Sequence, residues 1–514
     1  MPRLAATLDA PDGGSAPARR RRLTDARWLI VIFVVAVAIV RLPSFVHQLY
    51  DPDEAAIAVQ GIGLERGGVL YADVIDRKPP LAPTLYATAF RLTGTHDLRP
   101  LHVLAALELV GAALLIAWEL RERAGPEAGL WGGLLLIGGA LALVPQDAQA
   151  ANFSQLALLP GVAAIVLARR DSARAVAGAG VCVAIATLTR QTWAIGVLPA
   201  AFAAWWHGGR RWTRPALVVV ATLAGVASVG LMVPFGAFIH WTFTGNGSLL
   251  FDISQFGHVF ASAWASIGLF VAGHALALAL VGLRRWHRDE ADLWLWGLCG
   301  LLSVMAGARF FGHYWLQFLP ALVLLAAPAV PGLTRRWKSA AGGLLGITAV
   351  VYFVLACFPD QIHRLPDATR IAAVVRAHST SHDRVGVWGS YPEVYWLADR
   401  LPAAGLIHTD FVVGKSAGRL ESPATLRDAT PGAIDSYLDV MTNEPPKVFV
   451  DTSTADLRGY GHYPITVLPG LARLIRTEYH HIGVVNGVTI YERNAPAPRR
   501  NPDDSPYTVD TGTP

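Results

Sequence analysis

The feature that most constrains this chain is its alternation of long apolar runs with short arginine clusters. The first run is Trp28–Val40, and ten more follow before residue 359. A helix needs about 20 apolar residues to cross a bilayer upright, and backbone groups inside lipid must be paired within the helix itself. The pattern therefore predicts an α-helical polytopic membrane protein. The later runs are Leu101–Leu120, Ala128–Val144, Gln155–Ala168, Ala175–Leu188, Trp193–Trp206, Ala216–Phe235, Val259–Leu283, Leu293–Ala306, Trp315–Val330 and Ala341–Phe358.

The scarcity of charged residues supports this interpretation. Only 16% of the 514 residues are charged, against about 25% in typical soluble domains, and the mean hydropathy is +0.39. The net charge of +5 comes from short basic clusters between apolar runs. Such clusters orient membrane proteins and do not form the continuous basic stripe of a nucleic-acid-binding surface. We therefore expect the bilayer as a partner and no nucleic acid.

The arginine clusters predict an orientation in the membrane. With the N-terminus in the cytoplasm, every cluster between spans falls on the cytoplasmic side, as the positive-inside rule requires. This agreement favours about eleven spans in the cell membrane, with the C-terminus extracytoplasmic. A cleaved signal peptide is the alternative for the first run, but Arg41-Leu42-Pro43 follows it where a small-residue cleavage site would be. The clusters are Arg121-Glu122-Arg123, Arg169-Arg170, Arg210-Arg211, Arg284-Arg285 and Arg335-Arg336.

Three composition changes divide the chain into four parts. Residues 1–24 are predicted to be a disordered cytoplasmic tail, and 25–358 a transmembrane domain whose long outer loop covers 45–100. Within that loop, Leu81–Leu92 is too short to cross the bilayer, so we interpret it as an amphipathic helix in the outer interface. Residues 359–494 are predicted to form an extracytoplasmic α/β domain, followed by a disordered tail over 495–514.

The expected α/β domain alternates strand and helix patterns. Val385–Trp388 and Val448–Val450 resemble short buried strands, while Ala433–Met441 and Leu468–Glu478 have helical spacing. A hairpin is predicted over Ile482–Tyr491, because Asn486-Gly487 at its centre favours a tight two-residue turn.

The strongest candidate for chemistry is the acidic sequence Asp51-Pro52-Asp53-Glu54, which directly follows the first span. Carboxylates are costly to bring near hydrocarbon. Asp51 and Asp53 are good N-cap residues, so capping of the following helix is one explanation. Capping needs a single acid, however, and this loop supplies three. A carboxylate in a partly dry cleft could accept a proton from a hydroxyl nucleophile.

Cations accompany these acids on the predicted outer side. Lys78 precedes Pro79-Pro80, which holds it in extended geometry; either it binds a phosphate or its stem lies along lipid. Arg190 and Arg309 lie on the side that the positive-inside rule disfavours. A shared anionic ligand would explain both. Ion pairing of Arg190 with Asp147 or Glu54, or an aromatic belt around Arg309 and His313, is the simpler alternative.

Together these features favour group transfer. The sequence has no nucleotide-binding glycine motif. An outer acid could activate an acceptor hydroxyl, outer cations could hold a leaving phosphate, and the bilayer could hold its lipid. This combination predicts sugar transfer from a lipid-linked phosphate donor outside the cytoplasm. A transporter or flippase is the alternative, although the middles of the runs carry little charge apart from Glu108. A non-catalytic envelope scaffold would tolerate replacement of the acids.

The first loop resembles that of the class C glycosyltransferases (GT-C), in particular the protein O-mannosyltransferase and aminoarabinose-transferase group (family 39-like). The resemblance is carried by four motifs and spans about 28–358. They are Asp53-Glu54, Gly68-Val69-Leu70-Tyr71, Lys78-Pro79-Pro80-Leu81, and a later turn of the form R-x-x-x-H-Y at Arg309–Tyr314.

The resemblance implies a GT-C fold and a polyprenyl-phosphate sugar donor, with mannose as the sugar and inversion at the anomeric carbon. It makes Asp53 the base, with Glu54 beside it, and Lys78 the phosphate ligand. The acceptor could be a glycan, a lipid or a protein. The expected donor-site residues are Arg190, Arg309, His313 and Tyr314, with Asp51, Tyr71 and Gln191 as further candidates.

No cofactor is predicted. Some relatives use a divalent cation, but no set of ligands here has a decisive spacing, so the sequence predicts no metal site. Cys182, Cys299 and Cys357 lie apart inside apolar runs, where cysteine serves as a small hydrophobic residue.

Overall fold

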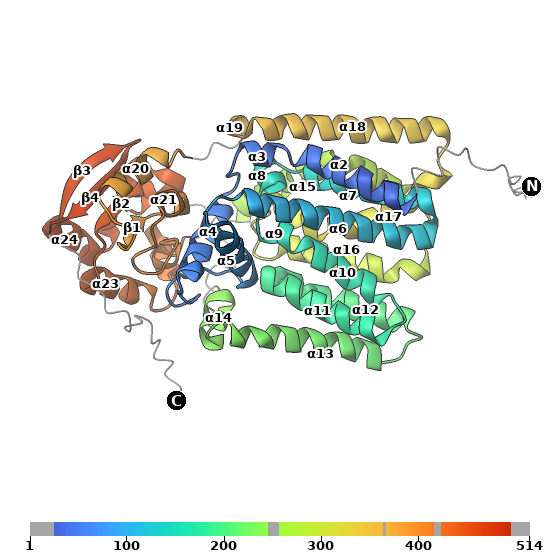
Figure 1. Cartoon of the computed structure of the whole chain (residues 1–514), viewed down its shortest axis with the longest axis horizontal. Helices are drawn as coiled ribbons and strands as arrows, with labels where there is room; N and C mark the ends of the chain where they lie inside the picture. The colour runs from blue at the N-terminus through green and yellow to red at the C-terminus, as the bar shows by residue number, and fades with distance from the viewer. Residues whose placement is uncertain (1–24, 245–255, 363–365, 416–422, 495–514) are drawn as a thin grey trace, which may run out of the picture.

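The computed structural model describes residues 25–244, 256–362, 366–415 and 423–494. The predicted tails, 1–24 and 495–514, lie outside the described residues. A bundle of long helices carries a small sheet with its own helices at one end (Figure 1).

Each of the eleven apolar runs contains a helix. Among the described residues, four helices are long and apolar enough to cross a membrane, namely Arg99–Ala124, Thr213–Leu231, Phe256–Gly282 and Arg335–Cys357. A mostly helical membrane protein is therefore supported, and the count of eleven spans stays a prediction. The helices are α2 (Ala26–Val40), α6 (Arg99–Ala124), α7 (Pro126–Leu141), α10 (Leu158–Ala168), α11 (Ala173–Thr189), α12 (Val197–His207), α13 (Thr213–Ala227), α15 (Phe256–Gly282), α16 (Ala291–Met305), α17 (Leu319–Ala326) and α18 (Arg335–Cys357).

Small residues let these helices approach closely. A Cβ added to Gly161 of α10 would lie 1.8 Å from the ring of Trp193, and one added to Gly133 of α7 would lie 2.0 Å from the ring of Phe33. Glycine at such contacts is the usual means of packing helices in membranes, where lipid supplies no hydrophobic drive.

The loops predicted to be cytoplasmic meet at one end of the bundle. Arg169 lies 2.8 Å from Glu119, while Arg123 and Arg284 lie 3.1 and 2.9 Å from Glu290. Three of the predicted basic loops are thus joined by ion pairs with the buried acids Glu119 and Glu290.

The first loop contributes α3 (Pro43–Val46), α4 (Pro52–Glu65) and α5 (Leu81–Thr93). The helix predicted over Leu81–Leu92 is therefore confirmed as α5, which ends at Gly94 in a left-handed conformation (φ 66°). The other loops contain the short elements α8 (Pro145–Gln149), α9 (Phe153–Leu156), η1 (Gln191–Gly196), α14 (Phe235–Thr242) and η6 (Gly312–Gln317). Of these, α8, α9 and α14 lie toward the end of the bundle that carries the sheet (Figure 1).

The C-terminal unit contains a four-stranded sheet in the order β1-β2-β4-β3. β1 (Val385–Trp388) and β2 (Val448–Asp451) are parallel, whereas β4 (Val488–Arg493) is antiparallel to both β2 and β3 (Tyr479–Val485). The predicted strands and hairpin are confirmed. The helices are α20 (Thr369–Ala377), α21 (Pro392–Ala398), α22 (Asp410–Val413), α23 (Ala433–Asn443) and α24 (Pro469–Glu478).

Short helices complete the described chain. They are η2 (Ser228–Leu231), η5 (Arg288–Glu290), η7 (Ala327–Gly332), α19 (Pro359–Ile362), η8 (Pro423–Asp428), η9 (Thr452–Ala455), η10 (Leu457–His462) and η11 (Ile465–Val467).

The first loop packs directly against the C-terminal unit. The Ile75 N–H donates to the Gly405 carbonyl at 2.7 Å, and the Trp396 indole donates to the His96 carbonyl at 3.0 Å. Two buried apolar clusters contain side chains from both segments. The predicted boundary at 358 therefore marks a change of composition, while the packing continues across the loop.

Candidate functional site

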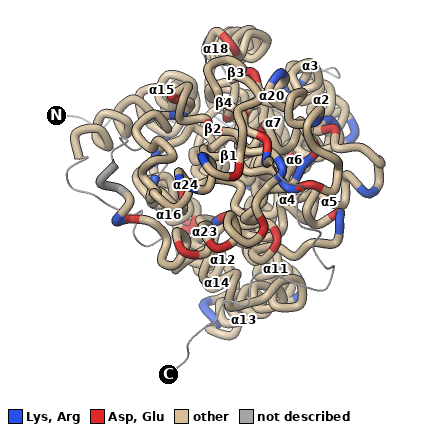
Figure 2. The backbone as a smooth tube through the Cα atoms, turned by 90° about the vertical axis from the view of Figure 1, so that its left-hand side faces the viewer, with Lys and Arg blue, Asp and Glu red and all other residues tan. Residues whose placement is uncertain are grey.

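The candidate site lies at the end of the bundle that faces the sheet. Four segments meet there: the N-terminus of α4, the loop before α5, the turn after α11, and η6. Seen from the end that carries the sheet, residues of both charge signs gather near α4 and β1 (Figure 2).

Two of the three acids of the first loop hold the start of α4. Asp51 is its N-cap and accepts from the Asp53 N–H at 2.8 Å. Glu54 is fully buried; its Oε2 accepts from Tyr50 N–H at 2.9 Å, and its Oε1 accepts from Ala151 N–H at 2.7 Å. The place of Glu54 beside Asp53 in the chemistry therefore stays a prediction. Both oxygens accept from backbone amides, and in this structure Glu54 ties the loop to the bundle.

Asp53 is the acid that faces outward into the site. Its Oδ2 lies 3.6 Å from Lys78 Nζ, and both side chains stay partly exposed. The ammonium also lies 4.7 Å from the ring centroid of Phe153. The Tyr71 hydroxyl donates a hydrogen bond to the Lys78 carbonyl at 2.7 Å and so holds the backbone of Lys78 in place. Two motifs that are distant in the sequence thus position one carboxylate and one cation beside each other.

The surroundings keep Asp53 ionised. Burial on its own raises the pKa of this carboxyl, but the electrostatic influence of Lys78, and then of His313, His408 and Arg190, lowers it to about 2. Asp53 is consequently charged at any physiological pH. The structure therefore brings together the predicted acid with three of the predicted phosphate ligands.

Arg190 is buried at this site, and its neighbours fix the orientation of its guanidinium group. Its guanidinium carbon lies 4.0 Å from the ring centroid of Tyr314, and its Nε donates to Thr192 Oγ1 at 3.1 Å. Gln191 donates from its side chain to the Arg77 carbonyl at 3.4 Å. The turn after α11 is thereby attached to the loop that carries Lys78.

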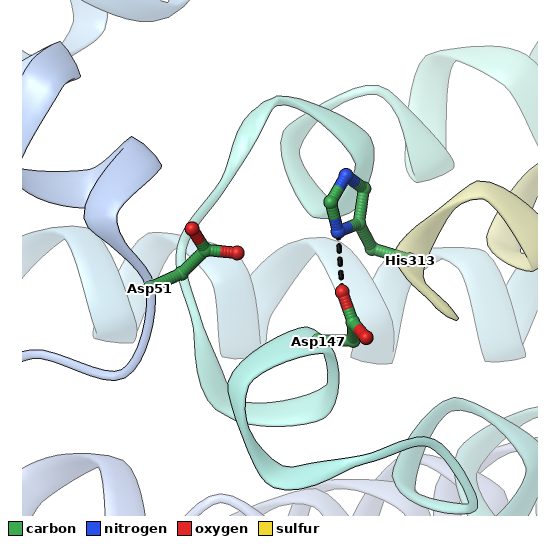
Figure 3. Close-up of side chains that lie close together, drawn as sticks. All are labelled: Asp51, Asp147 and His313. Atoms are coloured by element: carbon green, nitrogen blue, oxygen red, sulfur yellow. Dashed lines mark hydrogen bonds and ion pairs between the residues drawn. The ribbon is translucent and has the colours of Figure 1, made fainter. Parts of the chain in front are cut away.

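His313 pairs with Asp147, which the sequence had suggested only as an ion-pair partner for Arg190. The His313 Nδ1 and an Asp147 oxygen form a short hydrogen bond, and the Asp51 carboxylate points toward this pair (Figure 3). Arg309 is half-buried at the start of the same turn, and its place in the donor site stays a prediction.

The C-terminal unit supplies groups that no sequence motif indicated. Arg77 Nη2 lies 3.5 Å from Asp410 Oδ2, and its guanidinium carbon lies 5.0 Å from the ring centroid of Phe411. Asp410 also accepts from the Tyr460 hydroxyl at 2.7 Å. Adjacent residues of the first loop, Arg77 and Lys78, thus contact carboxylates from two different parts of the chain.

His408 is the second group that sequence reasoning missed. Its Nδ1 lies 3.0 Å from Ser390 Oγ, so this bond fixes the ring. His408 is among the groups that lower the pKa of Asp53 and of Asp410. Neither His408 nor Asp410 has a spacing relation to the first loop. For Asp147 one signal existed, since it is an acid directly after an apolar run on the predicted outer side.

Comparison with known proteins gives a fold. No protein-family model matches the sequence, and no curated protein matches it. Among solved structures, ArnT from Cupriavidus metallidurans in the apo state is 16% identical, with a TM-score of 0.61 over 91% of this chain and 98% of ArnT. ArnT bound to undecaprenyl phosphate is 15% identical, with a TM-score of 0.59 and the same coverage. The apo oligosaccharyltransferase of Archaeoglobus fulgidus is 11% identical, with a TM-score of 0.50 over 91% of this chain and 74% of that protein.

Proposed function

Because the chain has the fold of the class C glycosyltransferases, we propose that it transfers a sugar from a polyprenyl-phosphate donor to a hydroxyl of an extracytoplasmic acceptor. The observation that carries this proposal is the Asp53–Lys78 pair at 3.6 Å, with Arg190 and His313 beside it. An ionised acid next to cations suits a reaction that removes a proton from one oxygen while negative charge grows on another.

The proposed reaction is a single displacement. The acceptor oxygen attacks the anomeric carbon, the bond from that carbon to the phosphate oxygen breaks, and the hydroxyl proton passes to Asp53. The phosphate leaves with the bonding electrons. Lys78 and Arg190 bind its oxygens, and the configuration at the anomeric carbon inverts, as the resemblance implies.

Donor binding would also strengthen the base. In the structure Lys78 is the first of the positive groups that lower the pKa of Asp53. A phosphate that engages Lys78 neutralises this influence, so the pKa of Asp53 rises towards the range in which a carboxylate accepts protons well. The ion pair therefore serves as the resting state of the site.

The orientation belongs to the proposal as well. We infer eleven spans, a cytoplasmic N-terminus and an extracytoplasmic C-terminal unit. Two observations support this orientation. Three basic loops meet at one end of the bundle, and the candidate site residues meet at the other end. Mannose is the proposed sugar, and a glycan, lipid or protein hydroxyl the acceptor.

A transporter or flippase is not favoured, because the fold is that of transferases. A non-catalytic envelope scaffold would tolerate substitution of Asp53, whereas a transferase that uses this base would not.

The test uses membranes that contain the full chain and a radiolabelled polyprenyl-phosphate mannose. Asp53→Asn keeps the size of the side chain and removes the proton acceptor, so we expect transfer to fall by about 100-fold or more. Asp171→Asn is the matched control. Asp171 is exposed, and its carboxylate lies 3.2 Å from Arg214, outside the candidate site. Unchanged transfer by Asp53→Asn, at equal membrane content, would refute the proposed role.

A further inference from the structure

The segment of the C-terminal unit that carries His408 runs beside the first loop. The Ile75 N–H donates to the Gly405 carbonyl at 2.7 Å, and the Ile407 N–H donates to the Ile75 carbonyl at 3.4 Å, so the two segments pair in parallel. Parallel segments advance together along the pairing. Two residues further on, His408 therefore comes alongside Arg77.

The next contacts along both segments agree with this register. Arg77 Nη2 lies 3.5 Å from Asp410 Oδ2, and the neighbouring Lys78 lies 3.6 Å from Asp53. His408 is among the groups that lower the pKa of both carboxyl groups, Asp53 and Asp410. The pairing of the two segments thus brings a histidine of the C-terminal unit to the proposed base.

The ring of His408 is held at the end of β1. Ser390 lies two residues beyond that strand, and its Oγ is 3.0 Å from His408 Nδ1. The backbone is fixed as well, because Thr409 Oγ1 accepts from the Gly389 N–H at 2.9 Å. His408 is half-buried, and its Nε2 has no hydrogen-bond partner among the described residues. One ring nitrogen is thus occupied and the other is available.

Asp53 is unsuited to keep the proton that the proposed reaction gives it. Against the effect of burial, Lys78 and then its other neighbours hold the pKa of Asp53 at about 2, so the protonated carboxyl readily passes its proton to a stronger base. Imidazole is such a base, since histidine ordinarily titrates between about pH 5 and 8. A neutral histidine close to Asp53 therefore draws the proton transfer forward.

We propose that His408 takes the acceptor's proton from Asp53 and releases it to water, an inference that rests on the proposed function. His408 begins neutral, with the Nδ1–H donated to Ser390 Oγ and a lone pair on Nε2. The O–H bond of the acceptor breaks as its oxygen bonds to the anomeric carbon, and the proton moves to Asp53. The new O–H bond of Asp53 then breaks as the Nε2–H bond forms. The imidazolium gives this proton to water, and both side chains return to their starting states.

The charged side chains near His408 come from both units. They are Asp53, Arg77 and Lys78 of the first loop, and Asp410, Lys415 and Arg458 of the C-terminal unit. Arg458 also pairs with Glu393, at 3.2 Å. Because the pKa of Asp53 and that of Asp410 are both lowered, these carboxylates stay charged from pH 5 to 8. His313 also acts on Asp53, so the test compares pH profiles with and without His408.

The test measures transfer from radiolabelled polyprenyl-phosphate mannose between pH 5 and 8, in membranes with equal contents of the full chain. We expect His408→Gln to lower the rate at pH 7.5 by about tenfold or more. It should also remove the part of the acid-side fall in rate that protonation of His408 causes in the wild type. His480→Gln is the matched control, because His480 Nδ1 also meets a side-chain oxygen, Asn494 Oδ1 at 2.8 Å, but lies on the edge strand β3.

Added bases separate proton transfer from a structural role. His408→Ala leaves space at the ring position, so imidazole in the buffer should restore transfer. Pyrazole has nearly the same size but is a far weaker base, and should restore little. Ser390→Ala keeps the histidine and removes the bond that fixes it, so it should also slow transfer, whereas Ser390→Thr keeps a hydroxyl and should retain the rate.

The outcomes distinguish this inference from the proposed function. An unchanged rate and pH profile in His408→Gln, beside an inactive Asp53→Asn, would overturn the role of His408 and leave that of Asp53 intact. Equal restoration by imidazole and pyrazole would show that His408 only fills space, and would overturn the inference too. Absence of transfer by the wild type would overturn both.

Discussion

Asp51, Asp53 and Glu54 lie within four residues of one another, yet each meets different surroundings. Glu54 accepts from two backbone amides, Asp51 caps α4 and lies near Asp147 and His313, and Asp53 faces a lysine. Partners from distant segments decide these roles. The sequence therefore indicated an acidic site, but it could not assign the three acids.

Gly312 packs against Asp147, the hydrogen-bond partner of His313. A Cβ at this position would lie 2.5 Å from Asp147 Oδ2. Gly312→Ala should therefore displace Asp147 from His313 and cost about 1–3 kcal/mol of stability, the usual range for overpacking. Thermal unfolding of the purified protein would show this as a lower melting temperature.

The control for this prediction is Gly196→Ala in η1. A Cβ at Gly196 meets nothing within 4 Å, so the same change of residue should leave the melting temperature nearly unchanged. Equal melting temperatures for the two variants would show that the contact between Gly312 and Asp147 can relax without cost.

At the scale of elements, periodicity predicted most of what the structure contains. Each apolar run contains a helix, and the hairpin at Asn486-Gly487 has both residues at positive φ, 53° and 81°, as a tight hairpin turn requires. What periodicity could not predict is which loops touch. The contact of Arg77 with Asp410 joins segments more than 300 residues apart, and no local pattern encodes such a pairing.

His96 gives one of these inter-element contacts a pH dependence. It lies 2.9 Å from Asp399 of the C-terminal unit and 2.9 Å from Glu65 of α4. The hydrogen bond to Asp399, and then that to Glu65, raises the pKa of His96. Because the pKa of His96 is higher in the folded than in the unfolded protein, its protonated form stabilises the fold. This stabilisation is complete below the unfolded-state pKa of about 6.5, and it is lost as the pH rises through the folded-state pKa.

We therefore expect His96→Gln to lower the melting temperature most at about pH 6 and progressively less at higher pH. The effect should be at most about 1 kcal/mol, since the groups are partly exposed. Measuring the difference between wild type and variant at each pH removes the titration of other groups. His462→Gln, at an exposed position, should show no such trend. A difference that grows toward high pH would contradict the assigned sign.

At the scale of the whole molecule, the first loop belongs to two units at once. One buried cluster joins Val59 and Phe90 of the loop with Val385 and Val450 of the sheet, and another contains Tyr71 and residues of α23. The composition changes at residue 359, and the four-stranded sheet lies beyond this point in the chain. The composition change could not indicate that the core of that structure is completed by residues more than 250 positions earlier.

This sharing predicts that the bundle is not stable without the C-terminal unit. A chain that ends at residue 358 would expose Tyr71, Ile75 and Phe90, each at most 2% exposed in the whole protein. Each large apolar side chain contributes about 1.5–3 kcal/mol when buried, and a typical domain has only about 5–15 kcal/mol in total. We expect the truncated protein to aggregate when extracted in detergent, as size-exclusion chromatography would show. A chain ending at residue 494 is the control, and it should elute as the full chain does. A monodisperse 1–358 fragment with an unchanged melting temperature would mean that the loop folds on the bundle alone.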